Sequence, residues 1–131
     1  MPEEVKPPRA RGTTYNLLFV CTGNTCRSPM AEAIARSAIE RRAWPHVAVK
    51  SAGIAATPGV AASEQAVDVT REHQLDLSAH QSSRLTAELV EWADLVLAMG
   101  GSHAAAVADL GGAEKLALIT DFLDGDSAGR P

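Results

Sequence analysis

The sequence predicts an α/β fold: a three-layer αβα sandwich in which helices cover both faces of a four-stranded parallel sheet. Short apolar runs alternate along the chain with segments of helical periodicity, a pattern typical of βαβ units with right-handed crossovers. A chain of 131 residues is long enough for one hydrophobic core but not for two. Residues 15–131 are therefore expected to form one domain, preceded by a polar, proline-rich and flexible tail over residues 1–14.

The first strand is expected at residues 17–20 (LLFV), a continuous apolar run typical of strands that are buried on both faces. Ser28 and Pro29 then predict a helix start, with the serine hydroxyl as N-cap and the proline at the first helical position. The inner face of this helix is expected to carry Met30, Ala33, Ile34, Ser37 and Ala38, and the opposite face Glu32, Arg36 and Glu40.

The same alternation continues toward the C-terminus. A second strand is expected at residues 46–50, a short helix at 86–92, and two further strands at 95–99 and 116–119. The other two helices are expected after Pro58, with Ala62, Ala66, Val69 and His73 as inner stripe, and between a Ser102 cap and the glycines Gly111 and Gly112.

Composition excludes several classes of function. The formal net charge of −4 and the lack of a basic stripe argue against a nucleic-acid partner. No apolar run approaches the roughly 20 residues that a membrane-spanning helix needs, so we expect no membrane partner and a cytoplasmic location. The four histidines (His46, His73, His80 and His103) lack the spacing of metal ligands and are expected at the surface or as caps. Neither a metal nor a cofactor is expected.

The stretch CTGNTCRSP, residues 21–29, carries the chemistry. A loop from a strand end to a helix start directs backbone N–H groups into one hollow, and the helix dipole adds positive charge. Gly23 and Asn24 suit the tight backbone, and Arg27 can clamp a tetrahedral anion with two hydrogen bonds. Cys21 would lie at the floor of this hollow, where these groups favour a thiolate placed to attack phosphorus.

A plainer interpretation makes Cys21 a buried core thiol and Arg27 a surface cation. It fits a lone cysteine and a lone arginine. It does not explain why an apolar strand, the Cys-x5-Arg spacing, the Gly-Asn pair and the Ser-Pro helix start coincide. We therefore favour the phosphoryl-transfer interpretation, in which Ser28 both caps the helix and donates to the thiolate.

The segment VCTGNTCRSPMAE, residues 20–32, resembles the active-site segment of the low-molecular-weight protein tyrosine phosphatase family. The resemblance continues through SAG at 51–53, DLSAH at 76–80 and ADLVLAM at 93–99. It implies a cytosolic, metal-independent enzyme that acts on phosphorylated proteins, and it leaves the oligomeric state open. By this resemblance Cys21 forms a phosphocysteine intermediate and Arg27 binds the phosphoryl oxygens. Asn24 and Ser28 hold the loop and the thiolate, and Thr22, Gly23, Thr25 and Cys26 complete the substrate-binding loop.

Thr25 bears on the substrate. Tyrosine-directed members usually carry a bulkier aliphatic residue at this position, whereas threonine resembles the bacterial protein-arginine phosphatase branch. A hydroxyl there can meet a polar guanidinium or the attacking water, and the segment IAATPG after Ser51 offers no aromatic wall for a tyrosine ring. Phosphoarginine is therefore the expected substrate, with phosphotyrosine as the alternative.

Cys26 has two interpretations. It can form a reversible disulfide that protects or inactivates Cys21, which would give it a redox role, or it can be a small buried hydrophobic residue. No cysteine follows residue 26. The relay of thioredoxin-coupled arsenate reductases, a family with a similar loop, needs such a cysteine, so arsenate reduction is not expected.

One feature departs from the family pattern. The family's general acid is an aspartate in an Asp-Pro-aromatic segment, and this sequence contains no Asp-Pro. Asp121, Asp124 and Asp126 lie nearby but do not match the motif, and a solvated turn describes them better. The C-terminal acid loop and last helix are expected to be missing, either because the chain is truncated or because it is a naturally short variant. A phosphate-binding module with impaired catalysis is therefore an alternative function.

Overall fold

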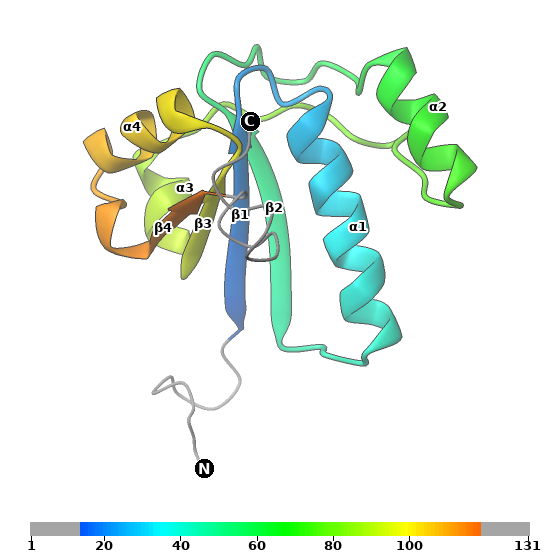
Figure 1. The fold of residues 1–131 in the computed structure, drawn as a ribbon, viewed down its shortest axis with the longest axis horizontal. Coiled ribbons are helices and arrows are strands. Elements are labelled where there is room, and N and C mark those ends of the chain that lie inside the picture. Colours follow the sequence, from blue (N-terminus) through cyan, green and yellow to red (C-terminus); the bar gives the residue numbers. More distant parts are fainter. Residues whose placement is uncertain (1–13, 119–131) are drawn as a thin grey trace, which may run out of the picture.

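The structure, a computed structural model, describes residues 14–118 and confirms the expected α/β class (Figure 1). The tail expected at residues 1–14 lies outside the described residues except for Thr14. The elements are β1 (Tyr15–Cys21), α1 (Arg27–Arg41), β2 (Val47–Gly53), α2 (Glu64–Glu72), α3 (Ala87–Trp92), β3 (Leu95–Ala98), α4 (Gly101–Asp109), the 3₁₀ turn η1 (Ala113–Lys115) and β4 (Leu116–Leu118).

The four strands form one parallel sheet in the order β2-β1-β3-β4. At its carboxyl end, β1 places Cys21 beside Gly53 of β2, and Val20 beside Ala98 of β3. Because a parallel sheet collects its strand ends at one edge, the loops after β1, β2 and β3 come together there. The segment between β1 and α1 thus lies in the middle of that edge (Figure 1).

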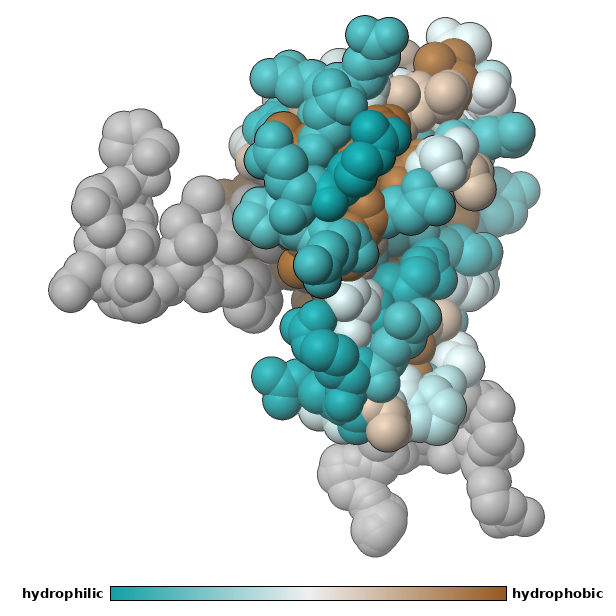
Figure 2. Space-filling model, turned by 90° about the vertical axis from the view of Figure 1, so that its right-hand side faces the viewer, coloured by the Kyte–Doolittle hydropathy of each residue, from teal (hydrophilic) through white to brown (hydrophobic). Residues whose placement is uncertain are grey.

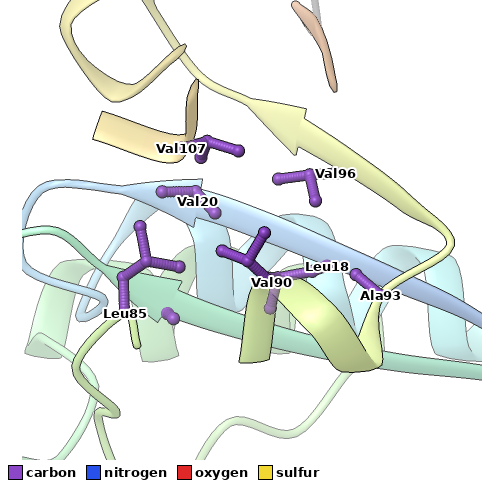
Figure 3. Packing of buried hydrophobic residues seen from close by; sticks show 8 residues of the cluster. Leu18, Val20, Leu85, Val90, Ala93, Val96 and Val107 are labelled. Atoms are coloured by element: carbon purple, nitrogen blue, oxygen red, sulfur yellow. The ribbon is translucent and has the colours of Figure 1, made fainter. Parts of the chain in front are cut away.

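Helices cover both faces of the sheet, which gives the predicted three layers (Figure 1). On the face under α3 and α4, Figure 3 shows Val90 of α3 directed toward Leu18 and Val20 of β1. On the other face, Phe19 and Val49 pack with residues of α1. Strand β1 is therefore buried on both faces, as its continuous apolar run predicts.

Helix α1 corrects two expectations. It begins at Arg27 with Cys26 as N-cap and no side-chain capping bond, so the prediction of Ser28 as N-cap is wrong. The predicted inner face is also wrong: the side chain of Ile34 is 57% exposed. The residues that pack on the sheet are Ala31, Ala35 and Ile39.

The side chains of Glu32 and Arg36 explain why α1 turns a different face toward the sheet than the one predicted. They do not point to solvent alone: Glu32 accepts a hydrogen bond from Ser51 of β2 (Oγ–Oε1 2.5 Å), and Arg36 donates to the carbonyl of Val49 (3.2 Å). Apolar residues occur on both sides of α1, so periodicity alone offers two stripes. The polar contacts with β2 select the stripe that faces the sheet.

The remaining helices lie where the sequence predicts them, but some of their buried residues and caps differ from the prediction. In α2, Ala66 is buried as predicted, but Val69 is 40% exposed and His73 is exposed at the C-cap. Thr70 occupies the buried position instead, because its hydroxyl bonds the carbonyl of Ala66 (2.8 Å). The N-cap of α4 is Gly100 rather than Ser102, and Thr86 caps α3.

Figure 2 shows the side of the molecule formed by α1 and α2, which is largely hydrophilic with scattered apolar residues. Among residues 14–118, no helix combines the length and apolar character needed to cross a membrane.

Gly111, at φ 91°, ends the α4 segment as predicted, and β4 follows after η1. Residue 119, the predicted last position of this strand, lies outside the described residues.

Candidate active site

The loop over residues 22–26 joins the end of β1 to the start of α1. Asn24 has φ 58°, a left-handed conformation that asparagine tolerates better than most residues. Within the described part of the chain, the backbone N–H groups of residues 22, 23 and 25–28 have no hydrogen-bond acceptor. Unpaired N–H groups of this kind, at the first turn of a helix, form a site for an anion.

Cys21 lies at the floor of this loop with 3% of its surface exposed. Its sulfur is 2.8 Å from Ser28 Oγ and accepts a hydrogen bond from the backbone N–H of Asn24 (3.3 Å). Ser28 Oγ also accepts from Asn24 Nδ2 (2.9 Å), which leaves the serine proton available for the sulfur. Two donors thus stabilise negative charge on Cys21 Sγ.

Asn24 is fully buried and organises the loop through both ends of its amide. Its Nδ2 donates to Ser28 Oγ and to Ser51 Oγ (2.8 Å), and its Oδ1 accepts from the backbone N–H of Ser83 (2.7 Å). Its backbone carbonyl accepts from His80 Nε2 (2.8 Å). Because every polar atom of this buried side chain is bonded, the left-handed turn is held from two distant segments, β2 and residues 80–83.

The chain of contacts continues beyond Asn24. Ser51 Oγ accepts from Asn24 and donates to Glu32, which in turn pairs with Arg36 on the surface of α1. The hydroxyls of Ser28 and Ser51 therefore each accept one hydrogen bond and donate one. The amide N–H groups of Asn24 at one end of this series can only donate and the Glu32 carboxylate at the other can only accept, which fixes the direction of every bond between them. Asn24 and Ser28 both contact Cys21 Sγ and each other, and their supporting roles remain predictions.

Gly53 supports the loop from below, because its lack of a side chain lets the backbone pass over it. A Cβ built there would lie 2.4 Å from the carbonyl oxygen of Thr22 and 2.9 Å from the backbone nitrogen of Asn24. These contacts are with backbone, so the loop itself would have to move.

Gly53→Ala is therefore expected to lower the free energy of unfolding by about 1–3 kcal/mol and to weaken phosphate binding. Urea denaturation and calorimetric titration with inorganic phosphate measure the two effects. The matched control is Gly101→Ala in the first turn of α4, where a Cβ meets nothing within 4 Å. Equal phosphate affinity in Gly53→Ala and the unsubstituted chain would contradict this account of the loop.

Arg27, the first residue of α1, has an exposed side chain, and within residues 14–118 no carboxylate pairs with it. Its charge reaches His103 of α4: burial first, and the Arg27 guanidinium second, hold the pKa of His103 below its usual value. His103 Nε2 lies 2.8 Å from Thr22 Oγ1. Thr22 therefore contacts α4, and the charge of Arg27 acts on the same histidine.

Thr25 and Cys26 are half-buried in the second half of the loop. The carbonyl of Thr25 accepts from the backbone N–H of Ser63 (2.8 Å), the N-cap residue of α2, and this ties the loop to α2. Both thiols, Cys21 and Cys26, are free. The proposed redox role of Cys26 therefore remains a prediction.

Sequence reasoning missed several residues that shape the site. Ser51, Ser83, His80 and His103 all bond the loop, although the histidines were expected at the surface or as caps. That expectation is wrong for His103, which is 3% exposed. His80 and Ser51 lie in the DLSAH and SAG segments on which the family resemblance rests, and this was the available signal.

Asp121, Asp124 and Asp126, which the sequence assigns to a solvated turn rather than to the family's acid motif, lie outside the described residues. Over residues 14–118, no three side chains of histidine, cysteine, aspartate or glutamate are placed to hold a metal ion together. The described site places the buried sulfur of Cys21 beneath a loop whose backbone N–H groups are unpaired.

A family model described as low molecular weight phosphotyrosine protein phosphatase matches residues 16–129. The chain belongs to this family. It is 45% identical over 112 residues to the protein-arginine-phosphatase of Bacillus subtilis, covering 84% of this chain and 73% of that protein. It is 49% identical over 87 residues to the probable low molecular weight protein-tyrosine-phosphatase EpsP of Ralstonia solanacearum, covering 66% and 57%.

Solved structures agree with the fold. A mutant of YwlE from Bacillus subtilis superposes with a TM-score of 0.78 at 43% identity, over 86% of this chain and 76% of that one. YfkJ, also from Bacillus subtilis, gives 0.83 at 26% identity, over 93% and 80%. The matched region spans 57% of the length of several relatives, EpsP among them.

Proposed function

We propose that this chain is a protein phosphatase that hydrolyses phosphoarginine through a phosphocysteine intermediate on Cys21. The observation that carries the proposal is the setting of Cys21 Sγ: a buried sulfur with two hydrogen-bond donors, at the floor of a loop with unpaired N–H groups. A structural cysteine in a core has no need of such surroundings. Phosphorylated proteins are the proposed substrates, and the cytoplasm is the proposed location.

The loop can bind the dianionic phosphoryl group by its backbone. The unpaired N–H groups at residues 22, 23 and 25–28 supply donors, and the start of α1 adds partial positive charge. The exposed guanidinium of Arg27 can then close over two phosphoryl oxygens. These groups also stabilise the charge that spreads over the equatorial oxygens during transfer.

In the proposed first step, the Cys21 thiolate attacks phosphorus from below, opposite the arginine nitrogen. The S–P bond forms and the P–N bond breaks, and the electron pair stays on the guanidine nitrogen, which takes up a proton. In the second step water attacks phosphorus, the S–P bond breaks and the thiolate returns as phosphate leaves with the release of a proton. Ser28 and the Asn24 N–H stabilise the thiolate as it departs.

Two comparisons support a covalent intermediate and arginine as the substrate. A solved YwlE arginine phosphatase, 44% identical, is a mutant with serine in place of a cysteine and carries a phosphorylated active-site serine. The protein-arginine-phosphatases of Bacillus subtilis and Geobacillus stearothermophilus are 45% and 49% identical to this chain. Phosphotyrosine is the second candidate, because EpsP is 49% identical as well.

The experiment is a side-by-side assay of phosphoarginine and phosphotyrosine peptides with equal sequences. The proposal expects a higher kcat/KM for phosphoarginine. A higher value for phosphotyrosine supports the second candidate. Phosphate binding without turnover of either peptide would mean that the chain is a phosphate-binding module.

Thr25→Ile is expected to shift the ratio of kcat/KM by about 10-fold toward phosphotyrosine, because an aliphatic wall replaces a polar one. Thr25→Val and Thr25→Ser are the matched controls, since the first removes only the hydroxyl and the second only the methyl group. We expect Thr25→Ser, which keeps the hydroxyl, to keep the ratio of kcat/KM values, and Thr25→Val to shift it toward phosphotyrosine as Thr25→Ile does. An unchanged ratio in Thr25→Ile and Thr25→Val would remove Thr25 as the selecting residue.

A further inference from the structure

We propose that His103 is a positioning residue for the phosphate-binding loop: it donates to Thr22 Oγ1 and thereby directs the Thr22 hydroxyl proton to a bound phosphoryl oxygen. The juxtaposition is long-range, because His103 lies in α4 and Thr22 in the loop after β1, with Nε2 and Oγ1 2.8 Å apart. The inference deepens the proposed function and rests on the loop being the phosphate site.

The surroundings of the imidazole decide which nitrogen carries the proton. His103 Nδ1 is buried and has no hydrogen-bond partner among the described residues. A proton there would be a buried N–H donor without an acceptor, which is costlier than a bare acceptor nitrogen. The imidazolium form would need that same proton and would lie near the Arg27 guanidinium. The ring is therefore neutral with its proton on Nε2.

The proton on Nε2 fixes the role of the hydroxyl it meets. If His103 Nε2–H donates to Thr22 Oγ1, the threonine proton cannot point back to the ring and must go elsewhere. The Thr22 side chain is exposed, and it belongs to the loop whose N–H groups are unpaired. An anion held by these N–H groups offers the acceptor.

This arrangement parallels the one beneath the loop. There, Asn24 Nδ2 donates to Ser28 Oγ and leaves the serine proton for Cys21 Sγ. On the α4 side, His103 Nε2 donates to Thr22 Oγ1 and leaves the threonine proton for the ligand. In both pairs a buried side chain, Asn24 or His103, orients a hydroxyl toward negative charge. Hydrogen bonds to a charged acceptor are stronger than those between neutral groups.

The first test compares Thr22→Val with Thr22→Ser by calorimetric titration of inorganic phosphate. Thr22→Val keeps the shape and removes the hydroxyl, so it is expected to weaken phosphate binding by about 10-fold. Thr22→Ser keeps the hydroxyl and is expected to stay near the unsubstituted value. Because phosphate binding needs no turnover, this result is independent of which phosphorylated residue, if any, the chain hydrolyses.

The second test uses two amides at position 103. The side-chain amide nitrogen of His103→Gln can reach the place of Nε2, whereas that of His103→Asn reaches only the place of Nδ1. His103→Gln is therefore expected to keep phosphate affinity, and His103→Asn to lose about as much as Thr22→Val, about 10-fold. In the Thr22→Val background the two amides should give equal affinities, since the hydroxyl they orient is gone.

The possible results distinguish a positioning role of His103 from a packing role, and both from the proposed function. Equal affinity for phosphate in Thr22→Val and the unsubstituted chain overturns the proposal, as does an identical loss in His103→Gln and His103→Asn, which would show a packing role. Thermal unfolding checks that each variant is folded, and the exposed Thr22 variants decide the matter if those of His103 fail to fold. A chain that binds phosphate as described but hydrolyses nothing refutes the proposed function and leaves this inference standing.

Discussion

Cys21→Ser is expected to reduce turnover of the better phosphopeptide by at least about 10⁴-fold while inorganic phosphate still binds. A hydroxyl is a much weaker nucleophile than a thiolate at neutral pH. The loop N–H groups and Arg27 are untouched by the exchange.

Steady-state kinetics and calorimetric phosphate titration measure the two halves of this result. Cys26→Ser is the matched control, the same exchange at the other cysteine, and it is expected to retain covalent turnover. In the unsubstituted chain, rapid quenching with acid should trap phosphate on Cys21. Residual turnover in Cys21→Ser within about 10-fold of the unsubstituted chain would contradict the covalent mechanism.

Asn24→Ala is expected to lower the free energy of unfolding by about 3 kcal/mol or more and to abolish phosphate binding at millimolar concentration. The change leaves the N–H of Ser83 and the buried hydroxyls of Ser28 and Ser51 without the partner that joins them. It also removes the side chain that fixes the left-handed turn over Cys21. Urea denaturation measures the stability.

The chain offers a matched control for the backbone part of this effect. Gln74 also has a positive φ, 65°, but its side chain is exposed. Gln74→Ala should change the free energy of unfolding by no more than about 0.5 kcal/mol. If Asn24→Ala cost as little as Gln74→Ala, the hydrogen bonds of the Asn24 amide would not be what holds the loop.

Much of the fold could be predicted because its signals are local. The apolar runs predicted at residues 17–20 and 95–99 needed no knowledge of their neighbours, and they lie in β1 and, except for residue 99, in β3. The anion-binding loop was also predictable, because a strand end, Gly23, Asn24 and a helix start follow each other directly. Local sequence therefore located the site.

The partners of the loop could not be predicted in the same way. His80 and His103 look like any other polar residues along the chain, and only the tertiary fold brings them to Asn24 and Thr22. The inner face of α1 was wrong for a related reason. Alanines lie on both sides of this helix, and its orientation depends on the contact between Glu32 and Ser51 of another element.

The hydrogen bonds of Asn24 have a consequence for how the chain folds. They join residues separated in sequence by 27, 56 and 59 positions. Contacts at such separations require closure of long loops, so the anion-binding turn takes its shape only when β1, β2 and the segment before α3 have already met. A bound anion therefore adds little to the speed of folding and instead slows unfolding, so occupancy of the site lengthens the lifetime of the folded chain.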